Sequence, residues 1–157
     1  LLSILKNNVL TTDAEIKRIL TNVIERFLIP KFYSLGLEAS GNWRSQLEVR
    51  KSSIFGTKYT EQLVYGRQPG TFAPIQPLKE WAKIKLGLDE RQALGAAFAI
   101  SKTLKEKGSR IYQNGGSDLL EVLNSKQVLD YINTEIGNYI SQQTVINIRN
   151  YVQQKLR

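Results

Sequence analysis

The sequence contains no cysteine and no histidine among its 157 residues. Disulfide frameworks, thiolate metal sites and the usual neutral-pH proton shuttle are therefore absent. These absences also exclude the commonest nucleophile–base pairs and most zinc sites. No apolar run approaches the roughly 20 residues of a membrane helix, and the opening residues 1–5 are too short for a signal peptide. We expect a globular protein that is not an enzyme, needs no cofactor or metal, and does not enter a membrane.

The remaining catalytic options fail on spacing. Ser101 and Lys102 are adjacent in a predicted helix, where successive side chains diverge by about 100°, so they do not form a working pair. Asp89 and Glu90 stand at a predicted helix start, where the backbone dipole favours negative charge, so capping explains them better than acid–base catalysis. Residues 66–70 lack the spacing of phosphate-binding loops. A binding or structural role is the better expectation.

Length and hydrophobic patterning indicate one α+β domain, residues 1–157. We expect a small antiparallel sheet with an N-terminal helix and several packed C-terminal helices. The predicted elements are a helix at about 12–29, strands at about 43–56, a Pro/Gly loop at 66–77, and helices at about 77–86, 89–107 and, in pieces, 117–157.

Local signals set the first boundaries. Thr12 and Glu15 have the spacing of a capping box, which predicts a helix start. Pro30 is expected to end or kink that helix, because proline lacks the amide hydrogen and disfavours helix in the residue before it. From Trp43 the apolar pattern changes to period two, which predicts a half-buried strand, and residues 51–53 predict a turn into a second strand.

The middle of the chain is punctuated by glycine and proline. Tyr59–Tyr65 is too short to distinguish strand from helix, but Gly66 marks its end. Pro77 suits the first turn of a helix, and Gly87 suits a left-handed cap at its end. Asp89 is expected to cap the following alanine-rich helix. Leu78 and Trp81 are expected to point to the core.

The C-terminal part shows helical periodicity from a predicted N-cap at Ser117. Gly137 and the β-branched run at 144–148 argue against one unbroken helix. Its neutral surface, rich in Gln and Asn, suits either a subunit interface or an ordinary amphipathic helix on its own core.

The net charge of +8 is concentrated in residues 44–110, which hold thirteen basic and six acidic side chains. Such a zone suits nucleic acid or an acidic protein face, and it also fits a solvated surface. In the first of its two basic groups, cations interleave with aromatic rings, a pattern able to bind phosphate and stack bases. Its members are Arg44, Arg50, Lys51, Lys58 and Arg67, with Trp43, Tyr59 and Tyr65. The second group is Lys102, Lys105, Lys107 and Arg110, too dispersed for a base-reading motif. Because Trp43 shares its predicted strand face with Leu47 and Val49, it is expected in the core rather than against a base.

Residues 56–108 resemble the lambdoid-type phage tail-component family, whose members join heads to tails or complete tails. This block is also similar to neck ring proteins of crAss-like phages. The matching features are, in chain order, Gly56, the Tyr-x-x-x-x-x-aromatic-Gly element at 59–66, the loop residues Pro69, Gly70 and Pro74, the stretch Pro77-Leu78-x-x-Trp81-Ala82-x-x-Lys85-Leu86-Gly87-Leu88, the helix residues Ala97, Ala99, Ile100 and Lys102, and Gly108.

The resemblance implies a structural virion protein of a tailed bacteriophage, located at the head–tail junction or in the tail and assembled in the host cytoplasm. Its implied partners are copies of itself in a ring, portal or adaptor proteins, and tail proteins, with no catalysis and no cofactor. The alternative function is a nucleic-acid-binding module that uses a basic face.

Two residue sets are the candidate contacts. A proline-limited loop loses little entropy on docking, which suits contacts with a partner or another copy. These residues are Arg67, Gln68, Pro69, Phe72 and Pro74. The second set would face packaged DNA, without reading its sequence, or an acidic neighbour. Its members are Lys102, Lys105, Lys107 and Arg110.

Overall fold

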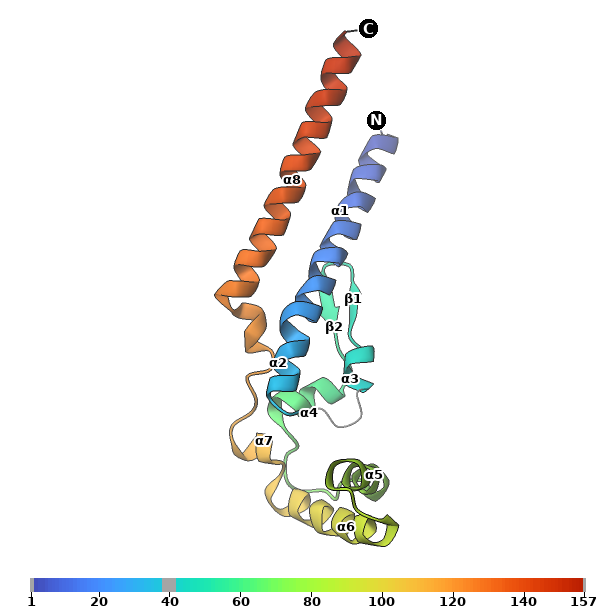
Figure 1. Cartoon of the computed structure of the whole chain (residues 1–157), viewed down its shortest axis with the longest axis vertical. Helices are drawn as coiled ribbons and strands as arrows, with labels where there is room; N and C mark the ends of the chain where they lie inside the picture. Colours follow the sequence, from blue (N-terminus) through green and yellow to red (C-terminus); the bar gives the residue numbers. More distant parts are fainter. Residues whose placement is uncertain (1, 38–41, 157) are drawn as a thin grey trace.

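The computed structural model describes residues 2–37 and 42–156, with side chains described for 12–37 and 43–156. The expected α+β class is confirmed: packed helices accompany one small antiparallel sheet. The molecule is elongated, with α1 and α8 side by side at one end and α5 and α6 as a hairpin at the other (Figure 1). The elements are α1 (Leu2–Val23), η1 (Ile24–Leu28), α2 (Ile29–Ser34), α3 (Asn42–Ser45), β1 (Glu48–Arg50), β2 (Ser53–Phe55), α4 (Tyr59–Tyr65), α5 (Ile75–Leu86), α6 (Glu90–Lys107), α7 (Arg110–Gln113), η2 (Glu121–Asn124) and α8 (Lys126–Lys155).

The N-terminal helix extends beyond the predicted 12–29 in both directions. Thr12 lies inside α1 rather than at its start, so the predicted helix start was wrong. Of the two outcomes expected at Pro30, a helix end is not observed, because Pro30 lies in the first turn of α2. Just before it, η1 is a π-helical turn in which the Ile29 amide bonds to the Ile24 carbonyl, five residues back. This wider turn lets the helix pass a residue that has no amide hydrogen and crowds the carbonyl four positions back.

The predicted strand from Trp43 was too long. Trp43 belongs to the helical turn α3, and within the described residues only β1 and β2 pair, with Val49 opposite Ile54. The turn joining them begins at Lys51, which has a left-handed φ of 53°. The period-two pattern misled because one buried tryptophan next to a short strand imitates a longer alternation.

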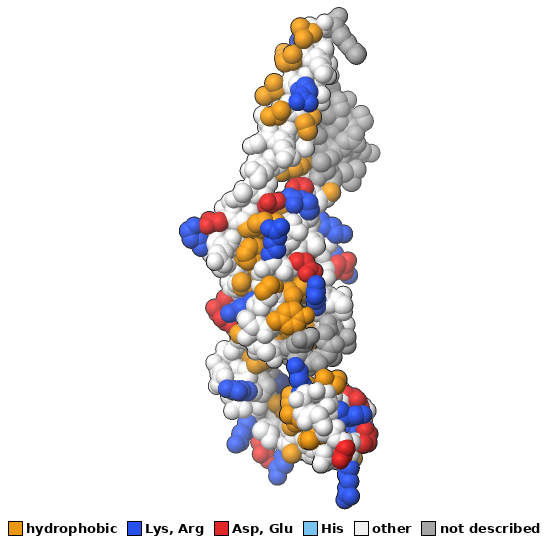
Figure 2. All heavy atoms as spheres, viewed as in Figure 1, with side chains coloured by type: hydrophobic (Ala, Val, Ile, Leu, Met, Phe, Trp, Pro, Cys, Tyr) orange, Lys and Arg blue, Asp and Glu red, His pale blue; other side chains and the backbone are white. Residues whose placement is uncertain are grey.

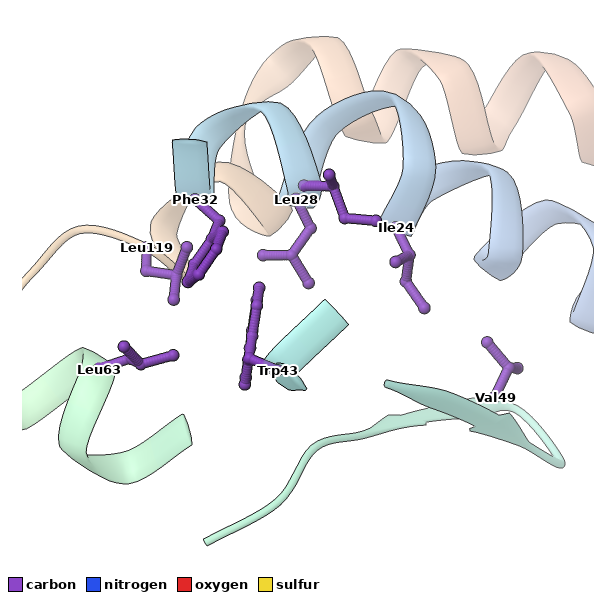
Figure 3. Packing of buried hydrophobic residues seen from close by; sticks show 8 residues of the cluster. Ile24, Leu28, Phe32, Trp43, Val49, Leu63 and Leu119 are labelled. Atoms are coloured by element: carbon purple, nitrogen blue, oxygen red, sulfur yellow. The ribbon is translucent and has the colours of Figure 1, made fainter. Parts of the chain in front are cut away.

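The main core lies between α2, η1, α3, α4 and the β1–β2 hairpin (Figure 3). The rings of Phe32 and Trp43 stack with centroids 4.6 Å apart. The Trp43 indole N–H donates to Thr60 Oγ1 at 2.9 Å, so its polar atom is satisfied. Burial of each of these rings contributes roughly 2–3 kcal/mol. The buried cluster is Ile24, Leu28, Ile29, Phe32, Trp43, Val49, Leu63 and Leu119.

The undecided segment Tyr59–Tyr65 is helix α4, which ends at Gly66 as predicted. Gly87 takes the predicted left-handed cap of α5, and Asp89 forms the predicted capping box of α6. The hairpin of α5 and α6 packs closely because its contact residues are small. These fully buried alanines are Ala82, Ala93 and Ala97.

Two C-terminal predictions were wrong. Ser117 is not an N-cap: its hydroxyl donates to the Leu63 carbonyl at 2.6 Å, which ties the segment to α4. Ser125 caps α8 instead, by accepting a hydrogen bond from the Val128 amide. The predicted helix in pieces is η2 followed by one helix of 30 residues, which continues through Gly137. In the described part of the chain, no helix is long and apolar enough to cross a membrane.

Candidate interaction surface

The predicted loop is shorter than expected, 66–74, and hydrogen bonds tie it along the C-terminal half of α6. Near one end, the buried hydroxyl of Ser101 donates to the Ala73 carbonyl at 2.8 Å. One helical turn further on, the Gly70 amide donates to the Lys105 carbonyl at 2.8 Å. The conformation of the loop is therefore held by contacts within the chain itself.

The other end of the loop meets the turn that leads into α7. The Arg67 amide donates to Ser109 Oγ at 2.9 Å, and the Ser109 amide donates to the Arg67 carbonyl at 2.8 Å. Gly66 has a φ of +76°, and a Cβ there would lie 2.3 Å from the Tyr112 nitrogen. A Cβ at Gly108 would lie 2.7 Å from the Arg67 carbonyl oxygen. Both glycines are needed for this close approach.

The five predicted loop contacts differ in availability. The guanidinium of Arg67 donates to Thr71 Oγ1 and to the Phe72 carbonyl, each at 3.1 Å, so it holds the loop together. Gln68 and Pro69 are exposed at the loop tip. Phe72 is 60% exposed, and Lys105 Nζ lies 4.2 Å from the centre of its ring. The loop also ends in an exposed residue, Pro74, which precedes α5.

The second basic group does not form one patch. Lys102 and Lys105 share a face of α6, whereas Lys107 lies about 140° around the helix from Lys102. Arg110 begins α7. All four side chains are exposed, and no ion pair holds any of them within the described residues. Lys105 and Lys107 lie in the last turn of α6, where the helix dipole favours cations without any ligand.

Two of the five cations in the first basic group are paired with carboxylates. Arg44 pairs with Glu25 at 3.0 Å and Arg50 with Glu48 at 2.6 Å, and the Arg50 guanidinium lowers the pKa of the Glu48 carboxyl. The tryptophan of this group, Trp43, is buried as predicted, so it cannot stack on a base. The other exposed members are Lys51, Lys58, Tyr59 and Tyr65.

An apolar groove lies between α4 and the α5–α6 hairpin, with a volume of about 880 Å³. The sequence patterns did not predict it. The prediction that Trp81 points to the core was wrong: it is 36% exposed and lines this groove. Helical spacing of apolar residues shows which face of a helix is apolar, but not whether other elements cover that face. Groove residues also include Leu37, Tyr59, Pro74, Ile84 and Ile111.

At the other end of the molecule, α8 exposes large apolar side chains. Figure 2 shows hydrophobic side chains along the upper part of the molecule. Beyond Gln143 every described residue of α8 is exposed. The exposed large apolar residues of α8 are Leu129, Ile136, Ile140, Val145, Ile146, Ile148, Tyr151 and Val152.

The polar groups with shifted pKa values have structural explanations. Lys79 and Lys83 form ion pairs with Glu90 at the start of α6. Their hydrogen bonds to the Glu90 carboxyl lower its pKa. Ser101 is committed to the loop, and its neighbour Lys102 is exposed to solvent. Across the described residues, no three His, Cys, Asp or Glu side chains gather to hold a metal ion.

Comparisons of this chain with family models, with curated proteins and with solved structures find no match.

Proposed function

We propose that this chain is a structural subunit of a tailed-bacteriophage virion, which assembles with copies of itself into a ring at the head–tail junction. One observation carries the proposal: two separate apolar surfaces, the groove and α8, lie at opposite ends of an elongated molecule (Figure 1). Large exposed apolar patches mark interaction sites. A subunit of a ring needs two different surfaces, because each copy meets two neighbours through a heterologous contact.

The loop 66–74 supports the same role. It presents Phe72 on a backbone already fixed by hydrogen bonds to α6. An ordered aromatic side chain binds a partner at a small entropic cost, so it suits a contact with a portal, adaptor or tail protein.

The resemblance of residues 56–108 supports placement at the neck or tail. Two of its glycines, Gly66 and Gly108, allow the loop to approach α7 closely. In this role the chain works by position and contact, without catalysis, cofactor or metal.

The alternative function, nucleic-acid binding, is favoured by Lys102 and Lys105, which are exposed together on α6 without ion-pair partners among the described residues. It has less support, because the aromatic ring best suited to stacking, Trp43, is in the core. Non-specific contact with packaged DNA remains compatible with a ring that surrounds the genome's path.

The test is made in particles. In a phage lacking this gene, the chain or its variants are supplied in trans, and the particles are examined by electron microscopy and mass spectrometry. We expect Phe72→Glu to give heads without tails, while Phe55→Glu, at an exposed phenylalanine of β2, supports complete particles. Absence of the wild-type chain from purified particles contradicts the proposal. Salt-dependent DNA binding by a chain absent from particles favours the alternative.

A further inference from the structure

The apolar groove between α4 and the α5–α6 hairpin carries two positive charges without acidic partners. Its charged lining residues are Arg67, Arg110 and Glu80. Glu80 is paired with Lys83 at 3.7 Å, whereas neither arginine has an ion pair among the described residues. The Arg67 guanidinium donates to uncharged oxygens of its own loop, and its buried Nε has no acceptor in the described part of the chain. The groove therefore suits an apolar group that is accompanied by a carboxylate.

The exposed end of α8 does not have this chemistry. Beyond Glu135 the chain contains no acidic residue, and α8 carries Arg149 and Lys155 there. Placing this end in the groove would bring like charges together, which is unfavourable. The counterpart of the groove is therefore a different surface.

An aromatic ring and a free carboxylate stand together on the outer side of α4. Tyr65 is 69% exposed, the largest exposed fraction of any aromatic side chain among the described residues. Glu61, four positions earlier, is exposed and has no ion pair within the same residues. Side chains four residues apart lie on one helix face, so the ring and the carboxylate project together. We call Glu61 and Tyr65 the α4 pair.

The α4 pair and the groove lie on different sides of the same helix. The groove-lining residues of α4 are Tyr59, Gln62 and Leu63. At 100° per residue, the α4 pair projects about 130° away from the mean direction of these three. The pair is therefore turned away from the groove of its own chain and is open to a neighbour. A surface and its counterpart on different sides of one subunit make a head-to-tail contact, which rotation repeats into a ring.

We infer that the groove of each copy binds the α4 pair of the next copy, with the Tyr65 ring against the apolar lining around Trp81 and the Glu61 carboxylate at Arg110. Tyrosine suits such a site, because its ring is buried while its hydroxyl reaches the polar rim. Copies of a chain with a net charge of +8 repel one another, and an acidic group placed at a free arginine offsets part of that repulsion. This inference rests on the proposed ring and names its subunit contact.

The first test reverses one charge on each side of the contact. Glu61→Lys is compared with Glu106→Lys, and Arg110→Glu with Arg91→Glu, because both control residues are exposed on α6 and do not line the groove. Half-assembly concentrations are measured by light scattering, with circular dichroism to verify folding. We expect the wild-type chain to assemble, and Glu61→Lys and Arg110→Glu each to raise its half-assembly concentration at least about 10-fold. Each control should stay within about threefold.

Combining the two reversals in one chain tests whether these side chains meet. Glu61→Lys with Arg110→Glu restores opposite charges across the contact, so assembly should return to within about threefold of the wild-type chain. A double variant that loses the product of the two single effects would show that Glu61 and Arg110 are not partners. That result refutes the contact.

The third test uses the absence of cysteine, which makes every thiol cross-link assignable. Tyr65→Cys places a thiol in the α4 pair, and Ile84→Cys places one in the groove, where this side chain is 65% exposed. A bismaleimide should join chains carrying both thiols into ladders, and chains carrying either one alone should stay single. Ladders missing from the double variant, or dimers of a single variant, contradict a head-to-tail contact.

The cross-links also separate this contact from the proposed function. A chain present in purified particles that forms no ladder there keeps its place in the virion and refutes the groove contact. Ladders in solution from a chain absent from particles support the contact and contradict the proposed function. A photoreactive maleimide on Ile84→Cys that captures a different virion protein assigns the groove to that protein, which also refutes the contact between copies.

Discussion

Substitution of Ser101 by alanine tests whether the loop is held by the bonds described. Ser101 is 1% exposed, and its hydroxyl is bonded to the Ala73 carbonyl at 2.8 Å. Alanine leaves that buried carbonyl without this partner, which costs about 1–3 kcal/mol. Alanine also favours helix by about 0.5 kcal/mol, so we expect a net destabilisation of about 1–2 kcal/mol.

The matched control is Ser141→Ala, the same change at an exposed position of α8. There only the helix preference acts, so the variant should be unchanged or stabilised by up to about 0.5 kcal/mol. Unfolding in urea is followed by circular dichroism and by tryptophan fluorescence, which reports on Trp81 in the α5–α6 hairpin and on Trp43 in the core. Ser101→Ala should lower the midpoint by roughly 0.5–1 M with an unchanged slope. Equal midpoints for the two variants would show that the bond does not hold the loop.

Three further predictions follow from other contacts. Gly66→Ala should destabilise by about 3–5 kcal/mol in the same urea assay, because backbone strain adds to overlap with α7. Gly36→Ala should lose only about 1–2 kcal/mol, because no described residue lies within 4 Å of the added Cβ. In an NMR titration the pKa of Asp118 should lie below its ordinary value of 3.8, because Lys31 donates to it; Lys31→Met should return that pKa toward 3.8. Since the folded-state pKa is lowered, the pair's contribution is present above pH 3.8 and is lost as the pH falls through the lowered value. Particle assembly or DNA retention should fall, with folding intact, when glutamate replaces Lys102, Lys105 and Lys107.

Each of these predictions has an opposing result. Equal stability of the two glycine variants would contradict the close approach at Gly66. An Asp118 pKa unmoved by Lys31→Met would show that the ion pair does not form in solution. The triple substitution lowers the net charge from +8 to +2, since each change removes two charges from the total. Normal infectious particles containing DNA would remove any role for these lysines.

Helix ends were predictable because their causes are local. Asp89 and Gln92 are three residues apart and close the capping box whatever lies around them. Gly66 and Gly87 end α4 and α5 through backbone conformations that side chains disfavour. One failure arose where a distant contact overrode a local signal. Ser117 has the chemistry of an N-cap, but its hydroxyl donates to a carbonyl of α4, 54 residues earlier.

The candidate surface was predictable only in part. The proline and glycine positions predicted the loop near its observed bounds. Because loops lie on the surface, they also predicted that Phe72 is exposed. The engagement of Arg67 within the loop was not predictable, because it depends on carbonyl oxygens brought together by the bend of the loop. The groove beside Trp81 depends on how far the hairpin stands from α4.

By itself, the sequence determined the secondary structure class, the capping box at Asp89, the ends of α4 and α5 at Gly66 and Gly87, and the absence of histidine and cysteine chemistry, because each depends on residue identity or near neighbours. Only the tertiary structure decided that Trp43 stacks on Phe32, that Trp81 lines an open groove, and that half of α8 is left exposed. Apolar periodicity shows which face of a helix avoids water. Whether that face meets the chain's own core or another molecule depends on where the other elements lie.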